Sequence, residues 1–335
     1  MSKITELLRE RILILDGAMG TMIQRHSLTE NDFRNEALKN HPKPLQGNND
    51  LLSITRPDVI KSIHAEYFQA GADIVETNTF SGTTIAQEDY ACEHLVYDIN
   101  YLSAKLAREV ADEFTAREPH KPRFVAGAMG PTNKTASLSP NVNDPGYRAI
   151  TFDQLAQAYA KQASALIDGG VDILLVETIF DTLNAKAALY AIEQVFEERN
   201  MRLPIMVSGT ITDASGRTLS GQTAEAFLIS VGHLPLLSIG LNCALGASAM
   251  LPYLEVLSQR APFAICAYPN AGLPNQFGEY DETPMLMGEQ VEEFLKRGVI
   301  NILGGCCGTT PDHIHRLAEI AKNYPPRIIP QLESA

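Results

Sequence analysis

Two adjacent cysteines, Cys306 and Cys307, lie between glycines in the stretch NILGGCCGTTPDHI, after a short apolar run and before a segment with helical character. On a regular strand their side chains would point to opposite faces, so a shared target requires the strand to end and the backbone to turn. The flanking glycines permit such a turn. Two thiolates that converge in this way suit a soft metal ion, with zinc favoured.

A catalytic zinc site has three protein ligands and one open position, and Cys243 in GLNCALG is the best third candidate. Cys266, inside an apolar run, and Cys92, in a connection, are poorer candidates. A thiol substrate in the open position would ionise at neutral pH, although a free thiol has a pKa of about 8.5. Such a thiolate is a nucleophile for alkyl transfer. The alternative interpretation is that each cysteine is only a small buried hydrophobic residue.

Polar side chains end several of the other apolar runs. Carboxylates in such places can bind the ammonium group of an amino-acid substrate, and backbone N–H groups in the following loops can bind its carboxylate. We expect Asp16 and Glu177 to bind the amino group, Glu76 to support the structure, and Asn270 to fill the fourth zinc position when substrate is absent. The alternative is that these residues cap helices or satisfy loop backbone.

The elements that must position these groups are short apolar strands alternating with helical patterns. Eight strands are predicted, at 12–16, 73–77, 123–127, 172–178, 204–209, 236–242, 263–268 and 301–305. Between them, 57–71 and 152–170 have helical spacing. Strands that are apolar throughout indicate a parallel sheet covered by helices on its outer face. Eight βα units in 335 residues predict a (βα)8 TIM barrel, with the chemistry in the loops after the strands.

The competing architecture is an open doubly wound sheet, which usually carries a G-x-G-x-x-G phosphate loop. The segment DGAMGTM at 16–22 lacks that spacing. Three connections are long, at 17–56, 128–151 and 269–287. The second and third are rich in turn residues, and long ordered loops are usually functional. His313 opens the last predicted helix, near the cysteine pair, and is a candidate to support the site.

Composition and charge argue against several classes of binding partner. The formal net charge is −13 and no basic stripe is present, which argues against nucleic acid and anionic membranes as partners. No secretory signal is recognisable, and no apolar stretch reaches the length of a bilayer span. Five cysteines, an odd number, indicate reduced thiols. We therefore expect a cytoplasmic enzyme.

The stretches GGCCGTTPDHI, GLNCALG, LDGAMGTMIQ, GADIVETNTF, ETIFDTLNAKAA and SGTITDASGRTLSGQT together resemble the homocysteine S-methyltransferase family. Within that family, the chain is most similar to the N-terminal homocysteine-binding module of cobalamin-dependent methionine synthases. The resemblance implies a (βα)8 barrel that binds zinc through Cys243, Cys306 and Cys307, with the homocysteine sulfur as fourth ligand. It also implies that Asp16 and Glu177 lie near the amino group of homocysteine. Its carboxylate would lie near the backbone around Thr79, Phe80 and Ser81.

The same resemblance implies that the barrel, residues 1–325, activates homocysteine for methyl transfer from methylcobalamin, with the methyl group coming originally from 5-methyltetrahydrofolate. No D-x-H-x-x-G cobalamin motif is present. The cobalamin and folate modules are therefore expected on another segment or subunit, with residues 326–335 as the start of a linker or a C-terminal tail.

Three alternatives remain at this point. One is a homocysteine methyltransferase that uses betaine or S-methylmethionine. Another is a zinc-stabilised binding module without chemistry, and the third is a Schiff-base aldolase. Cationic methyl donors are usually held by aromatic cages, and the sequence has no Trp.

Overall fold

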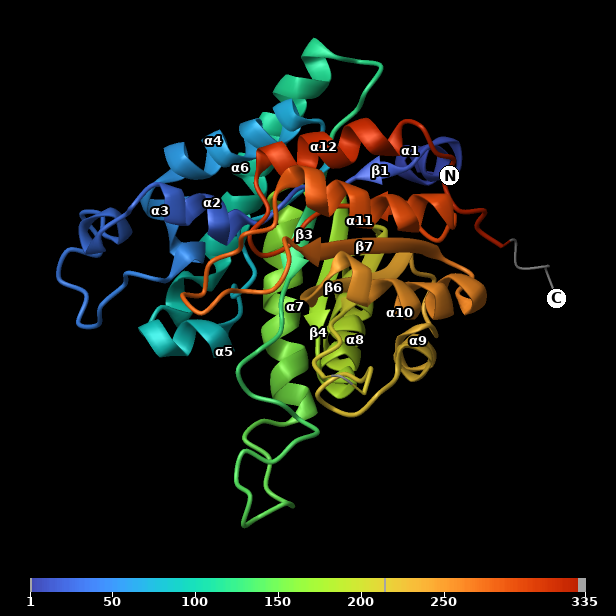
Figure 1. Cartoon of the computed structure of the whole chain (residues 1–335). Coiled ribbons are helices and arrows are strands. Elements are labelled where there is room, and N and C mark those ends of the chain that lie inside the picture. Colours follow the sequence, from blue (N-terminus) through green and yellow to red (C-terminus); the bar gives the residue numbers. More distant parts are fainter. Residues whose placement is uncertain (1, 214, 331–335) are drawn as a thin grey trace.

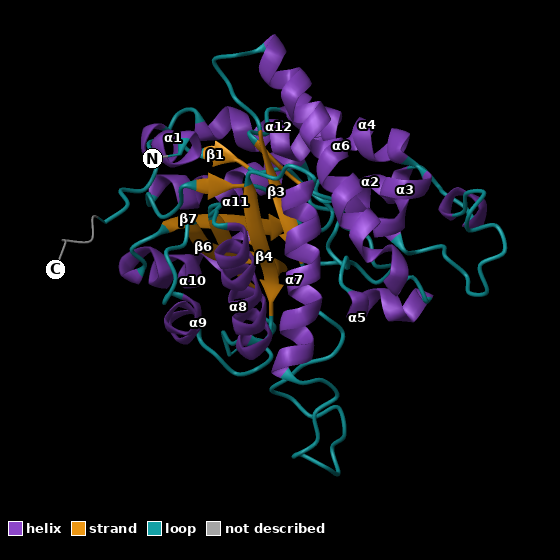
Figure 2. Ribbon diagram, turned by 180° about the vertical axis from the view of Figure 1, so that it is seen from behind, coloured by secondary structure: helices purple, strands orange, loops and turns teal. Residues whose placement is uncertain are grey.

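The computed structural model describes residues 2–213 and 215–330. Its centre is an eight-stranded parallel sheet in the order β1-β8-β7-β6-β5-β4-β3-β2, surrounded by helices (Figures 1 and 2). The strands are β1 Leu13–Ile14, β2 Ile74–Glu76, β3 Phe124–Met129, β4 Ile173–Ile179, β5 Ile205–Gly209, β6 Ser238–Gly246, β7 Ala264–Asn270 and β8 Ile302–Leu303.

Twelve α-helices and four short 3-10 helices occur in the described ranges. The α-helices are α1 Lys3–Glu10, α2 Met19–Arg25, α3 Leu52–Thr55, α4 Pro57–Ala70, α5 Thr84–Gln87, α6 Val96–Arg117, α7 Phe152–Asp168, α8 Thr182–Arg199, α9 Ala224–Val231, α10 Ala247–Arg260, α11 Pro284–Lys296 and α12 Pro311–Ala321. The 3-10 helices are Glu30–Phe33, Asn49–Leu51, Glu88–Tyr90 and Glu93–Leu95. None of the helices in the described ranges is long and apolar enough to cross a bilayer.

The sheet closes on itself between its first two strands. Leu15 pairs with Ile74 in a parallel bridge, and the Asp16 N–H donates to the Ile74 carbonyl at 3.0 Å. On the other side of the bridge, the Asp73 N–H donates to the Ile14 carbonyl at 2.7 Å. The predicted (βα)8 barrel and its eight strands are therefore confirmed, and the open sheet is excluded.

Side chains along each strand point alternately to the inside and the outside of the barrel, which produces two apolar cores. Inward-facing residues such as Leu13 and Leu15 fill the barrel, and outward-facing residues such as Ile14 pack against the surrounding helices. Leu7 and Leu8 of α1 belong to the inner core, so α1 covers the end of the barrel where the strands begin. The opposite end, where the strands finish, is left for the site.

Two of the three long connections agree with the sequence analysis, and one differs. The segments 130–151 and 271–283 are turns without helix, and the green loop before α7 extends away from the barrel in Figure 1. The segment 17–56, expected to be a loop, instead contains α2, α3 and two 3-10 helices. Apolar side chains on these short helices are buried, which stabilises them against the barrel.

The predicted helix at 57–71 is observed as α4, which begins at Pro57 and ends before Gly71, a residue with φ of 116°. The predicted helix at 152–170 is α7, which begins after a capping box between Thr151 and Gln154. It ends at Asp168, two residues earlier than expected.

Residue 326 starts the predicted linker or tail, of which 331–335 lie outside the described residues. In the described part, the buried Arg327 guanidinium donates to the backbone carbonyls of Ser258, Ala261 and Phe263. The Asn301 side chain donates to the Arg327 carbonyl at 2.7 Å. These contacts fasten the C-terminal segment beneath the barrel.

Arg327→Met is expected to lower the free energy of unfolding by about 2–4 kcal/mol, because three carbonyls lose a charged donor. Urea or thermal unfolding measures the change. The control is Arg297→Met, which removes an ion pair of a half-exposed arginine with Glu255 and is expected to cost under about 1 kcal/mol. Equal stability of the two variants would contradict a structural role for Arg327.

Candidate active site

The three cysteines predicted to bind metal meet at the end of the barrel where the strands finish. Cys243 lies near the end of β6, and Cys306 and Cys307 follow β8. All three sulfur atoms lie within 4.8 Å of one another, and the Cys243 and Cys307 sulfurs are 3.8 Å apart. Tetrahedral zinc with Zn–S bonds of about 2.3 Å holds its sulfurs about 3.8 Å apart, so the cluster fits that ion. The cysteines form no disulfide.

Backbone turns bring these sulfurs together. Cys243 and Ala244 have φ values of 58° and 53°, and the pairing of β6 with β7 shifts at this point. The Cys306 N–H donates to the Pro269 carbonyl at 2.8 Å, and the Ala271 N–H donates to the Cys307 carbonyl at 2.9 Å. The loop after β8 is thus tied to the end of β7.

Gly308 completes the turn after the cysteine pair with φ of 80°. A Cβ atom at this position would lie 2.3 Å from Cβ of Tyr280, so only glycine fits. Tyr280 in turn contributes to lowering the pKa of the Cys307 thiol. The glycines that the sequence analysis associated with a turn therefore also let the β7 to α11 loop approach the cysteines.

The thiols influence one another's ionisation. Hydrogen bonds from Cys243 and Cys306 lower the pKa of the Cys307 thiol. Hydrogen bonds with Cys243 and Cys307, together with burial, raise the pKa of Cys306. One thiol therefore ionises readily, and three thiolates at this spacing require a cation to balance their charge.

Cys266 and Cys92 lie elsewhere, as predicted. Cys266 belongs to the apolar core inside the barrel, and burial raises the pKa of its thiol. Cys92 is a buried residue of the connection after β2. Neither joins the three-sulfur cluster.

Three carboxylates form a second cluster at the same end of the barrel. Asp16 and Glu177 are 3% and 4% exposed, and the Asp16 carboxylate accepts the Glu76 N–H at 3.0 Å. Glu76 and Glu177 each shift the pKa of the other's carboxyl group, and the Tyr268 hydroxyl lies 3.4 Å from Glu177. Glu76, expected to be supporting structure, is thus a direct member of the cluster.

Burial raises the pKa of all three carboxyl groups well above its usual range, and mutual repulsion adds to the effect. None of the ion pairs among the described residues involves Asp16, Glu76 or Glu177. A buried acidic cluster without a basic partner suits a bound cation such as an ammonium group. The negative charge of Cys307 also raises the pKa of Glu177, which places this cluster beside the cysteines.

The loop after β2 contains the backbone expected to bind the substrate carboxylate. The Thr79 N–H donates to the Thr77 carbonyl at 2.8 Å, and the Ser81 N–H donates to Asp50 at 2.9 Å. The N–H of Phe80 has no hydrogen-bond partner among the described residues, and the Phe80 side chain is partly exposed. Of the three predicted backbone donors, Phe80 is therefore the one available to a ligand.

Asn270 ends β7 as predicted. Its side chain is buried, and its Oδ1 atom accepts no hydrogen bond from any described residue. The preceding Pro269 carbonyl binds the Cys306 N–H, so Asn270 is adjacent to the cysteine loop. His313, by contrast, caps α12 through Thr310 and binds the Glu282 carbonyl at 2.7 Å, which makes it structural.

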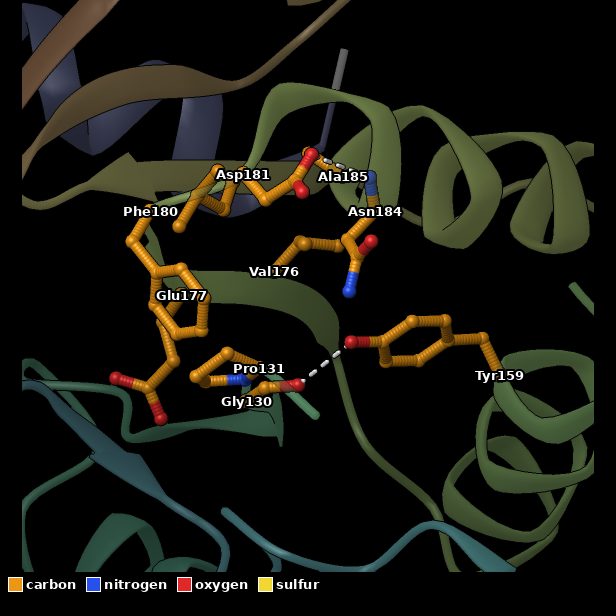
Figure 3. A pocket seen from close by; sticks show the side chains of 10 residues that line it. Gly130, Pro131, Tyr159, Val176, Glu177, Phe180, Asp181, Asn184 and Ala185 are labelled. Carbon is orange, nitrogen blue, oxygen red and sulfur yellow. Dashed lines mark hydrogen bonds between the residues drawn. The ribbon is translucent and has the colours of Figure 1, made fainter. Parts of the chain in front are cut away.

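A small pocket flanks the outer side of β4 between α7 and α8 (Figure 3). Tyr159 donates to the Gly130 carbonyl at 2.9 Å, and the carboxylate of Glu177 points away from Tyr159 and Asn184 (Figure 3). The pocket therefore lies behind the acidic cluster and adds no functional group to it.

Three further polar residues lie beneath the two clusters: Asn242, a polar strand end for which no role was predicted, and Ser208 and Tyr268, which were not predicted as site residues. All three face the barrel interior, and Asn242 is paired in register with Tyr268. The two-residue alternation of side chains along a strand predicts that these three residues face inward, because each lies an even number of residues from an inward-facing neighbour on its own strand.

Residues 13–321 match the sequence profile of the family described as homocysteine S-methyltransferase. The chain belongs to this family. Solved structures with a similar fold include the metallated form of the homocysteine methyltransferase MmuM from Escherichia coli, with 21% identity and a TM-score of 0.70. That alignment covers 94% of this chain and 98% of MmuM.

A B12-independent methionine synthase from Shewanella sp. W3-18-1, solved in complex with selenomethionine, has 15% identity and a TM-score of 0.50. The alignment covers 84% of this chain and 91% of the synthase. Family membership confirms the predicted resemblance and makes the chain a methyltransferase of homocysteine S-methyltransferase type.

Proposed function

We propose that this homocysteine S-methyltransferase binds zinc through Cys243, Cys306 and Cys307 and methylates homocysteine with a methyl group from methylcobalamin. The cobalamin, recharged from 5-methyltetrahydrofolate, would be carried by another module or subunit. The observation that carries the proposal is the pairing of a three-thiol cluster with a buried acidic cluster at one end of the barrel. Homocysteine has a thiol and an ammonium group that match these two clusters.

Each part of the substrate has a counterpart in the chain. The ammonium group would lie among Asp16, Glu76 and Glu177, whose buried charges it neutralises. The free N–H of Phe80 would bind the substrate carboxylate. The unpartnered amide oxygen of Asn270 suits the fourth metal position before the substrate thiol arrives.

When bound, zinc would lower the pKa of the substrate thiol so that it is a thiolate at neutral pH. The acidic cluster and the Phe80 N–H would hold the amino-acid end, which directs the sulfur outward from the barrel. Attack of the sulfur on the methyl carbon forms the S–C bond of methionine, and the leaving group keeps the electron pair of the broken bond. The thiol proton leaves to solvent.

Two features support a donor carried on a separate module. Exposed apolar side chains occur on loops that follow the strands, including Phe80, Leu219, Leu273 and Phe277, and they suit a large partner. A betaine or S-methylmethionine donor would favour an aromatic cage, and the chain has no Trp.

Calorimetric titration of homocysteine into zinc-loaded and chelator-stripped protein tests the first half of the proposal. Two buffers of different ionisation enthalpy count the released protons. We expect 1:1 binding with proton release only in the zinc-loaded protein, while circular dichroism shows both forms folded. Unfolding on zinc removal would instead support a zinc-stabilised module, and borohydride trapping of a substrate on a lysine would support an aldolase.

Methionine formation from free methylcobalamin, S-methylmethionine and betaine, assayed in parallel with the zinc-loaded protein, tests the donor. We expect methylcobalamin to be the most effective of the three. Faster transfer from S-methylmethionine or betaine would overturn the donor assignment while leaving the homocysteine site intact.

A further inference from the structure

Asn242 lies between the two clusters and belongs to neither. It is fully buried, ends the regular part of β6, and immediately precedes Cys243. We infer that Asn242 is a positioning residue that couples the three cysteines to the acidic cluster and so fixes the distance between substrate sulfur and ammonium. This inference rests on the proposed homocysteine site.

The Asn242 amide uses its entire hydrogen-bonding capacity. Its Oδ1 accepts from the Ser208 hydroxyl at 2.7 Å and from the Thr178 N–H at 3.1 Å. Its Nδ2 donates to the Thr178 hydroxyl at 2.8 Å and towards the Cys306 sulfur at 3.9 Å. The Thr178 N–H can only donate, which fixes the orientation of the amide. Neither a smaller residue nor a carboxylate reproduces all four contacts.

Next to the acidic cluster, Asn242 hydrogen bonds with the strained backbone of Thr178. Thr178 has φ of 52°, an unfavourable value for a β-branched residue, and it directly follows Glu177 at an irregularity in β4. Such conformations cost about 1–3 kcal/mol and persist only when surrounding contacts impose them. Asn242 contacts both the N–H and the hydroxyl of Thr178, so it imposes the turn that follows Glu177.

On the sulfur side, Asn242 acts on two of the three cysteines. It precedes the left-handed turn at Cys243 and Ala244, and its amide N–H points to the sulfur of Cys306. An N–H donor to a thiolate ligand fixes its orientation and reduces its electron donation to a metal. One rigid amide thus restrains both ends of the substrate site.

Asn242→Ala and Asn242→Asp test this role, with Asn301→Ala as matched control. Asn301 is also fully buried, accepts the Ile265 N–H at 2.9 Å and donates to Arg327 at the opposite end of the barrel. The measurements are zinc affinity by competition with a chromogenic chelator, homocysteine affinity by calorimetry, thermal unfolding, and the sulfur-to-cobalt absorption of the Co²⁺-substituted protein.

Both Asn242 variants are expected to weaken zinc and homocysteine binding by about 10- to 100-fold each and to shift the cobalt absorption. Asn301→Ala is expected to lower the melting temperature only. Folded Asn242 variants with wild-type affinities and spectrum would overturn the inference. If the wild-type protein itself bound neither zinc nor homocysteine, the proposed function would fail and the inference with it. Asn242→Asp retains size and both acceptors, so it provides a folded sample if the alanine variant does not.

Discussion

Cys307→Ala is expected to reduce bound zinc from about one per chain to less than about 0.1, and methyl transfer by at least about 1000-fold. The remaining two sulfurs cannot complete a three-ligand site, and the substrate thiol then keeps its ordinary pKa. The same loss is expected for Cys243→Ala and Cys306→Ala, because the three sulfurs form one cluster. Metal analysis and methionine formation measure the effect.

The folded barrel should survive this substitution, because its two apolar cores do not depend on the metal. The control is Cys92→Ala, which removes a buried thiol outside the cluster and should keep both zinc and activity. Zinc-dependent transfer that persisted in Cys243→Ala would rule out this ligand set. Loss of folding together with loss of zinc would favour the zinc-stabilised module.

Glu177→Gln is expected to weaken homocysteine binding about 100-fold at neutral pH while making the metal-stripped protein more stable. Binding weakens because the substrate ammonium loses part of a buried counter-charge. Stability rises because the wild-type cluster buries three carboxyl groups without a basic partner. A gain of about 1–3 kcal/mol in the free energy of unfolding at pH 8 is expected.

The pH dependence of stability follows from the same carboxyl groups. Their pKa values are raised in the folded protein, so folding takes up protons above the unfolded pKa values of about 4. Wild-type stability from this cluster is therefore fully present below that pH and declines as pH rises towards the folded pKa values. Glu177→Gln should show a smaller decline when urea unfolding is measured between pH 5 and about 9.

Asp73→Asn provides a control, because it is expected to change the free energy of unfolding in the opposite direction. Asp73 is fully buried at the other end of the barrel, where Arg11 binds both carboxylate oxygens at 2.8 Å. Its replacement should lower stability by about 3–5 kcal/mol and leave homocysteine affinity unchanged. If Glu177→Gln destabilised the protein as Asp73→Asn does, the view of an unpaired substrate-binding cluster would be wrong.

The sequence by itself determined the barrel and most of the candidate site. Recurring apolar runs predicted all eight strands, because a strand covered by helices is apolar on both faces. Parallel strands end at one edge, so Cys243, Cys306, Cys307 and the carboxylates at strand ends were expected on the same side. Their placement at that edge follows from periodicity and strand direction, whereas the convergence of the three sulfurs also requires the backbone turns at Cys243 and Gly308.

Only the tertiary structure determined which contacts each of these groups makes. The interaction between the Glu76 and Glu177 carboxyl groups, the bound N–H of Ser81 and the free N–H of Phe80 depend on side-chain and backbone contacts between separate βα units. The coupling role of Asn242 depends on the left-handed conformation of Thr178, 64 residues away in the sequence. Local sequence patterns cannot predict such contacts, because each contact forms only when the barrel closes and brings distant strand ends together.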